Sequence, residues 1–437
     1  MAFIRDARDP ACGDPGLRER LAAVPSEPRA LIDARLAETV REERGRLVAS
    51  LVRILRDWEL AEELVQEALV VALETWPRDG MPRNPGAWLL TTARHRAIDR
   101  LRRDARYRER LGIIGEELRD VTSSWSETGG VLAQDDRLRL IFTCCHPALS
   151  REAQVALTLR TVAGLETPAV AKAFLVPEAT VAQRIVRAKR KIRDAGIPYR
   201  VPEAAELPGR LEQVLAVLYL VFNEGYLASA GDAAERRDLA RDGAWLASLL
   251  VRLMPDEPEA IGLLAMMRLH LARADARFAA DGSLVLLPEQ DRSTWDHDAI
   301  ANAHELLERA LRMGRIGPYQ LQAAIVACHA TSASYAGTDW GEVVALYDRL
   351  LELTPTPVVA LNRALAIAEL RGPDEALAAL EPLAARLADY HLYHAARGLL
   401  LRRLGRIEEA RETERRALAL TANPAERRLL EERLAAS

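Results

Sequence analysis

Long hydrophobic runs are absent from this chain of 437 residues. No stretch of about 18 apolar residues without a charge occurs, so the sequence predicts no membrane-spanning helix. The opening residues, MAFIRDARDPACGDPG, lack the apolar region and the small-residue cleavage site of a signal peptide. We therefore expect a cytoplasmic protein.

Cysteine is scarce: there are four, and none forms a CxxC pair. This spacing excludes a disulfide framework and a standard zinc site. Cys144, Cys145 and His146 are adjacent in the segment TCCHP, but neighbouring cysteine side chains diverge and seldom share a metal. We expect the two thiols to pack on a buried face, and a metal or redox role is the alternative.

Aromatic residues make up only 5% of the chain, whereas Ala, Leu, Arg and Glu are abundant. This composition favours helix over sheet, so we predict an all-α fold. The length is too great for a single core and indicates two or three domains. The 60 Lys and Arg residues are balanced by 64 Asp and Glu residues, which excludes a uniformly basic nucleic-acid binder. Any nucleic-acid surface must be local.

Motifs for catalysis are also missing. The chain has no glycine-rich phosphate loop, no nucleophile elbow and no His-x-x-x-His zinc helix, so neither an enzyme nor a cofactor is expected. One segment, PEQDRSTWDHD, leaves an alternative open, because its acidic residues and histidine can be read as an acid–base or metal site. These residues are Glu289, Asp291, Asp296, His297 and Asp298.

Interruptions of the apolar pattern by proline, glycine and polar residues divide the chain. We expect an irregular arm, a first helical unit, a polar linker, a second helical unit and a long helical C-terminal domain. Their ranges are 1–30, 31–106, 107–134, 135–200 and 208–437.

The first helical unit shows apolar residues at helical spacing on both sides of a break near Asp57. A further helix is predicted over AWLLTTARHRAIDRLRR. On that helix Leu90, Ala93 and Ala97 share one face, while Arg96 and Arg100 share the other. One face packs and the other is cationic.

The strongest local charge lies in RIVRAKRKIR, residues 184–193, which has six cationic side chains and no acid. At helical spacing its apolar residues form one face together with Val181. The opposite face carries hydrogen-bonding and cationic groups from Thr180, Gln183, Arg184, Arg187 and Lys191.

A shorter helix precedes this basic helix. Thr167 as N-cap and Pro168 in the first turn predict a helix from Pro168 to Phe174, followed by a tight turn and a second helix that begins at Pro177 or Glu178. A short helix, a tight turn and a longer basic helix are typical of a helix–turn–helix that places its second helix in the major groove. The alternative is a solvated basic helix on an ordinary bundle.

The order of these parts resembles the extracytoplasmic-function (ECF) sigma factors of bacterial RNA polymerase over residues 36–200. The segment AWLLTTARHRAIDRLRR is similar to the end of sigma region 2, and ATVAQRIVRAKRKIR is similar to region 4. The resemblance implies core RNA polymerase and promoter DNA as partners. It departs from the usual pattern at His95, Ala169, Pro177 and Ala179.

The resemblance also implies roles for particular residues. The polar face of the basic helix, formed by Thr180, Gln183, Arg184, Arg187 and Lys191, is called the recognition face and would contact the −35 element. The polymerase would be bound by Glu62, Glu63, Gln66 and Glu67 of DWELAEELVQEALVVALETW. The −10 element would be contacted by Trp88, Arg94, Arg96, Arg100, Arg102 and Arg103, although a core role for Trp88 is the alternative.

The C-terminal region repeats. Glu342, Glu375 and Glu409 stand in register at spacings of 33 and 34 residues, the period of TPR-like helix–turn–helix repeats. Sigma factors with such an extension form a subgroup that this chain also resembles, which implies that the extension governs sigma activity, with possible intramolecular contact to the sigma regions. A stand-alone helix–turn–helix regulator with a ligand-binding solenoid is the alternative.

Overall fold

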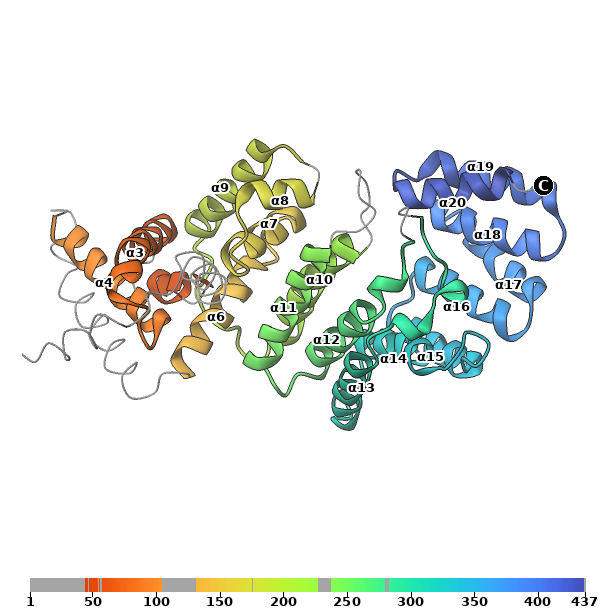
Figure 1. The fold of residues 1–437 in the computed structure, drawn as a ribbon, viewed down its shortest axis with the longest axis horizontal. Helices are drawn as coiled ribbons and strands as arrows, with labels where there is room; N and C mark the ends of the chain where they lie inside the picture. The colour runs from red at the N-terminus through yellow and green to blue at the C-terminus, as the bar shows by residue number, and fades with distance from the viewer. Residues whose placement is uncertain are drawn as a thin grey trace, which may run out of the picture. The chain divides into compact units, whose positions relative to one another are not determined.

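The computed structural model describes residues 44–45, 47–53, 55, 57–103, 131–174, 176–226, 237–279 and 283–435. These residues are helical apart from turns and one isolated bridge between Phe278 and Leu284, which confirms the all-α fold (Figure 1). Across the same ranges no helix has both the length and the apolar character that crossing a membrane requires. The chain forms two compact units, Met1–Gly129 and Gly130–Ser437. The N-terminal arm lies outside the described residues.

The first unit contains α3 (Trp58–Asp79) and α4 (Pro85–Arg103), which pack against each other. The expected break near Asp57 is confirmed, because the Asp57 carboxylate accepts a hydrogen bond from the Leu60 N–H at 3.0 Å and caps α3. Trp76 is buried between the helices and meets Trp88 edge-on at 5.4 Å between ring centroids.

The second unit begins with a four-helix subdomain. Its first helix starts at Val131, inside the segment expected to be linker. The helices are α6 (Val131–Cys144), α7 (Arg151–Thr161), α8 (Thr167–Ala173) and α9 (Glu178–Asp194).

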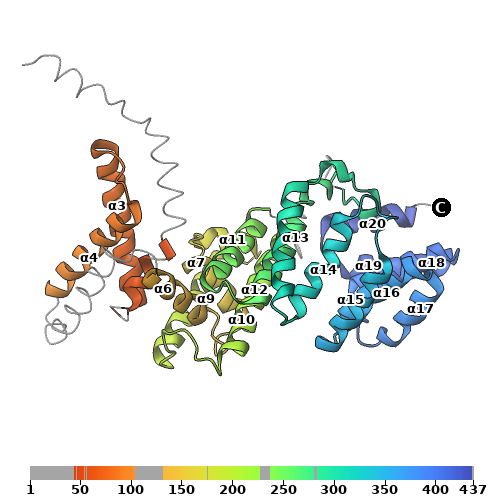
Figure 2. The same cartoon turned by 90° about the horizontal axis from the view of Figure 1, so that it is seen from below.

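The rest of the second unit is a succession of helices in which each packs on a neighbour in sequence, as Figures 1 and 2 show. The first part comprises α10 (Leu207–Tyr226), α11 (Arg237–Leu253), α12 (Pro258–Leu271), α13 (His297–Arg312) and α14 (Pro318–Thr331). The segment between α12 and α13 forms three short 3-10 turns, η2 (Ala274–Ala276), η3 (Leu287–Glu289) and η4 (Arg292–Thr294).

The second part contains the repeats. Its elements are α15 (Trp340–Leu353), α16 (Pro357–Leu370), α17 (Pro373–Leu380), η5 (Glu381–Leu383), α18 (His391–Arg403), α19 (Ile407–Leu420) and α20 (Pro424–Ala435). The helices α15, α17 and α19 each open a helix pair, and they begin 33 and 34 residues apart. The period seen in the sequence is therefore a period of helix pairs.

The last repeat has a buried ion pair at a position where TPR repeats usually carry an aromatic residue. The Glu414 side chain is fully buried and accepts two hydrogen bonds from Arg402, both 2.7 Å long. Gly398 faces it across the α18–α19 contact, and a β-carbon there would approach the Glu414 side chain to 2.7 Å. The bidentate pair replaces the ring while the small residue keeps the helices close.

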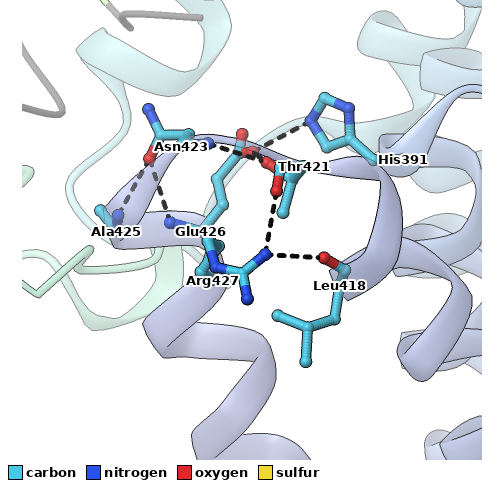
Figure 3. Close-up of polar contacts among 7 residues, drawn as sticks. All are labelled: His391, Leu418, Thr421, Asn423, Ala425, Glu426 and Arg427. Atoms are coloured by element: carbon cyan, nitrogen blue, oxygen red, sulfur yellow. Dashed lines mark hydrogen bonds and ion pairs between the residues drawn. The ribbon is translucent and has the colours of Figure 1, made fainter. Parts of the chain in front are cut away.

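The turn between α19 and α20 is held by polar contacts that Figure 3 shows. The Asn423 side chain accepts from the Ala425 and Glu426 N–H groups at 3.0 and 3.1 Å and so caps α20. Glu426 pairs with His391 at 3.0 Å and accepts from Thr421 at 2.5 Å. Although burial acts to raise it, the hydrogen bonds from His391 and Thr421 hold the pKa of Glu426 below its ordinary value. The chain end is thereby tied to α18.

Candidate nucleic-acid interface

The helix–turn–helix forms from α8 and α9, which pack on each other and on α7. The prediction of Thr167 as N-cap is wrong by one residue, because the carbonyl of Glu166 already accepts the Val170 N–H at 3.1 Å. Glu166 is therefore the N-cap and Thr167 is the first helical residue. The side chain of Glu166 makes no capping bond and lies 3.7 Å from the Arg160 guanidinium.

The second helix begins at Glu178, with Pro177 in extended conformation as its N-cap. Its apolar face is confirmed, since all four predicted side chains are buried. They are Val181, Ile185, Ala188 and Ile192. A stripe at spacings of four, three and four holds α9 in one rotational position, so the polar side chains must point outward.

On the outer face Gln183 and Arg187 are exposed, while Thr180 and Arg184 are partly exposed. In the described part of the chain, the side chains of Gln183 and Arg187 make no hydrogen bond or ion pair. Arg184 lies close enough to Glu152 of α7 to act on that carboxyl electrostatically. The N-terminal half of α9 thus presents an uncommitted polar surface.

The C-terminal half of α9 differs. Lys191, expected on the recognition face, donates to the carbonyl of Ala148 in the loop before α7. Arg190 and Arg193 both pair with Asp194, at 3.2 and 3.4 Å. These cations still favour phosphate, but their side chains have partners within the subdomain.

In the first unit, the predicted packing face of α4 is confirmed, because Leu90, Ala93 and Ala97 are buried. Arg96 and Arg100 are exposed on the opposite side. Arg94 is partly buried and has further contacts within the chain. The side chains of Arg102 and Arg103 lie outside the described residues.

The structure brings the expected −10 residues and the expected polymerase residues together. Arg100 lies 2.9 Å from Glu63 and 3.6 Å from Glu67, and Arg96 lies 3.6 Å from Glu67. Each of these side chains is about one-third to one-half exposed, so each pair contributes only about 0–1 kcal/mol. Glu62 is partly exposed and Gln66 is exposed on the same face of α3.

Trp88 is only partly buried, because its ring stands edge-on against Trp76 rather than inside the core. Trp88 therefore packs on Trp76 and remains partly exposed. The sequence reading missed three exposed apolar side chains, Val70 and Leu73 on α3 and Val186 on α9. The only feature of the sequence that could have indicated their exposure is that each is an apolar residue outside the buried face of its helix.

The thiol pair is buried, as expected. Cys144 and Cys145 are fully inaccessible, and burial raises the pKa of the Cys145 thiol to about 11. Within the described ranges no group of three or more potential metal ligands occurs. His146 accepts the Ala148 N–H at 3.1 Å.

In the acidic segment 288–298, Asp291 and Asp296 serve as helix caps. Asp291 accepts from the N–H and hydroxyl of Ser293 and caps η4, and these bonds lower the pKa of its carboxyl. Asp296 caps α13 by accepting the Ala299 N–H at 2.9 Å. His297 contacts the carbonyl of Arg292 at 3.1 Å. The acids close helix ends.

The helix–turn–helix subdomain and the C-terminal extension lie in one compact unit. Arg151 of α7 donates to the carbonyl and side chain of Gln213 on α10 at 3.3 and 3.0 Å. Arg210 of α10 donates to the carbonyl of Phe142 at 2.6 Å. These bonds join α10 to α6 and α7 and leave the outer face of α9 exposed.

Comparison with known families places three matches along the chain. Sigma-70 region 2 matches residues 39–107, and sigma-70 region 4 matches residues 139–192. A family of unknown function, DUF6596, matches residues 210–311. The first two matches cover α3–α4 and α7–α9. The sigma-70 family that they represent is not a class of enzymes.

A protein named "Uncharacterized protein R00370" from Rhizobium meliloti (strain 1021) is 46% identical over 388 residues, covering 88% of this chain and 91% of that protein. The ECF RNA polymerase sigma factor SigK of Mycobacterium bovis (strain BCG / Pasteur 1173P2) is 28% identical over 186 residues, 42% of this chain and 96% of SigK. SigK of Mycobacterium ulcerans (strain Agy99) is 29% identical over 153 residues, 34% of this chain and 79% of that protein. No solved structure matches the chain. The protein therefore belongs to the ECF sigma factors, which direct promoter-specific transcription by RNA polymerase, and it carries a helical extension beyond region 4.

Proposed function

We propose that the outer face of α9 reads the −35 promoter element. The observation that carries this proposal is the exposure of Gln183 and Arg187 without partners in the N-terminal half of the helix. Gln and Arg can form bidentate bonds with base edges, and recognition helices read bases mainly with their N-terminal residues. Val186 adds an exposed apolar contact suited to a thymine methyl group. Lys191 and Arg193 supply attraction to phosphate.

The first unit would contact the −10 element through α4 and core polymerase through α3. Arg96 and Arg100 are cationic and exposed, and Trp88 offers a partly exposed ring on which an unpaired base can stack. The ion pairs to Glu63 and Glu67 are weak, so exchanging them for DNA phosphate and for polymerase costs little. This protein would act in the cytoplasm, where polymerase and promoter meet, and would itself catalyse no reaction.

The extension would govern this activity through region 4. The hydrogen bonds that join α10 to α6 and α7 support this role, because they hold the subdomain that carries α9. Because the outer face of α9 stays exposed, the extension would act by orienting region 4 rather than by covering its DNA-binding surface.

Run-off transcription with purified core polymerase and a candidate promoter tests the proposal. Replacement of Arg187 by Ala should lower initiation about tenfold on the matched −35 element and much less on mismatched elements, because one good base contact contributes about 1–3 kcal/mol. The matched control is Arg193→Ala on the same helix, which should lower initiation evenly on all promoters. Equal losses for both variants, or initiation that does not require the protein, would contradict the proposal.

A further inference from the structure

An unusual group of cationic side chains lies in the extension where η4 meets α12 and α14. Arg273 follows α12 and is only 8% exposed. Its guanidinium lies 5.4 Å from the ring centroid of Trp295, and that of Arg292 lies 4.5 Å from the same centroid. His329 of α14 completes the group, because Arg292 donates to its carbonyl at 2.6 Å. We call these four residues the Trp295 cluster.

Several N–H groups of the Trp295 cluster are buried without an acceptor. They are Nε and Nη1 of Arg273, Nη2 of Arg292 and Nε1 of Trp295. Among the residues that the structure describes, the guanidinium of Arg273 has one hydrogen-bond contact, a long one of 3.4 Å from Nη2 to Nδ1 of His270. Within the described residues no carboxylate lies within ion-pair distance of Arg273 or Arg292. Burying an unpaired charge costs several kcal/mol, so this arrangement calls for a negative partner.

The contacts of Arg292 and the state of His329 do not neutralise this positive charge. Arg292 uses Nη1 for the carbonyls of His329 and Ser332, at 2.6 and 2.7 Å, and this leaves Nη2 over. Burial and the two arginines lower the pKa of His329 to about 4, so its imidazole is neutral at pH 7 and offers one more N–H. The group therefore presents donors to whatever enters it.

A cavity of about 630 Å³ lies beside η4, α13 and α14, and Arg292 is the member of the Trp295 cluster that lines it. Its lining includes Arg292, Ser293 and Ser332 and the carboxylates of Glu305 and Glu308. This volume suits a small metabolite. An oxyanion would be attracted to the arginines, whereas the two glutamates disfavour a second negative charge in the same cavity.

We propose that the cavity beside η4, α13 and α14 binds a small metabolite that carries one oxyanion group, a carboxylate or a phosphate, held by Arg292 and attracted by the buried charge of Arg273 close behind it. Both groups match the planar guanidinium donors. The site lies wholly within the extension, and it does not depend on how the sigma regions recognise promoters.

Thermal unfolding and calorimetric titration of the full-length protein test this site with inorganic phosphate and with acetate, each against sodium chloride at matched ionic strength. At least one of the two anions should raise the Tm saturably, and the anion that does so identifies the group. Replacing Arg273 by Met should weaken that binding at least tenfold. The control is Arg371→Met, an exposed arginine 3.5 Å from Glu375, which should leave binding unchanged.

The stability of the Arg273→Met protein in chloride gives a second readout. Removing an unpaired buried charge should leave its Tm equal to or above that of the wild type, whereas wild type with the bound anion should exceed both. The proposal is overturned if neither anion acts differently from chloride, since water then satisfies the donors, or if Arg273→Met retains the full anion effect.

Discussion

His329 illustrates how a single side chain can take its acidity from its surroundings. It lies near the end of α14, its ring 5.1 Å from that of Trp340, with Arg273 and Arg292 close by. Burial and these two positive charges lower the pKa of His329 from 6.5 to about 4. In the unfolded chain His329 is therefore protonated below about pH 6.5, whereas in the folded chain it is protonated only below about pH 4.

This difference predicts that the free energy of unfolding falls as the pH is lowered. Between pH 7.5 and 5.5 the contribution of His329 should drop by about 1 kcal/mol. Urea unfolding in phosphate-free buffer, compared with the His329→Gln variant, measures it, because the substitution removes this titration and leaves the carboxylates. The same pH dependence in both proteins would show that His329 titrates normally in the fold.

At the scale of elements, some helices of the extension pack so closely that their contact requires a glycine. Gly262 of α12 faces α14, and a β-carbon at this position would lie 2.8 Å from the backbone nitrogen of Gln320. At Gly209 of α10, by contrast, an added β-carbon would have no neighbouring atom within 4 Å. One glycine is required by packing and the other is not.

Replacing Gly262 by Ala should therefore destabilise the extension by about 1–3 kcal/mol, because one backbone must move away from the other. Gly209→Ala is the matched control and should stabilise α10 by up to about 1 kcal/mol through its higher helix propensity. Thermal unfolding of both variants measures the difference. A Gly262→Ala protein as stable as wild type would mean that α12 and α14 can separate freely.

At the scale of the whole molecule, region 4 is joined to the extension at α10. If the bonds from Arg210 and to Gln213 fix region 4, the double variant Arg210→Met, Gln213→Ala should loosen α6 and α7. Each lost bond to a charged group contributes about 1–3 kcal/mol, so amide hydrogen exchange in residues 138–161 should accelerate at least tenfold.

Glu212→Ala provides the control for this experiment, since Glu212 is exposed on the same turn of α10. Run-off transcription with the same variants then asks whether looser attachment changes initiation. If exchange accelerates while transcription is unchanged, the extension does not govern activity through this contact. If exchange is also unchanged, the α10 bonds do not hold region 4.

Much of the candidate DNA-binding surface could be predicted from the sequence. The spacing of Val181, Ile185, Ala188 and Ile192 determines which side of α9 is buried, and so which side faces outward. The repeat period likewise predicted the helix pairs of the extension. These properties are local, because helical geometry relates residues three and four apart without reference to the rest of the chain.

The tertiary structure decided which faces meet. Arg100 and Glu63 are 37 residues apart, and only the packing of α3 on α4 makes them an ion pair. In the same way, a loop read as a possible acidic site became a set of helix caps that carries Arg292 and Trp295 to Arg273. Periodicity shows that a face is buried but not against what, because contacts between distant residues depend on the arrangement of whole helices. The sequence by itself determined which side of α9 faces outward, because helical spacing sets the buried stripe, and the fold decided that region 4 is joined to its extension through α10.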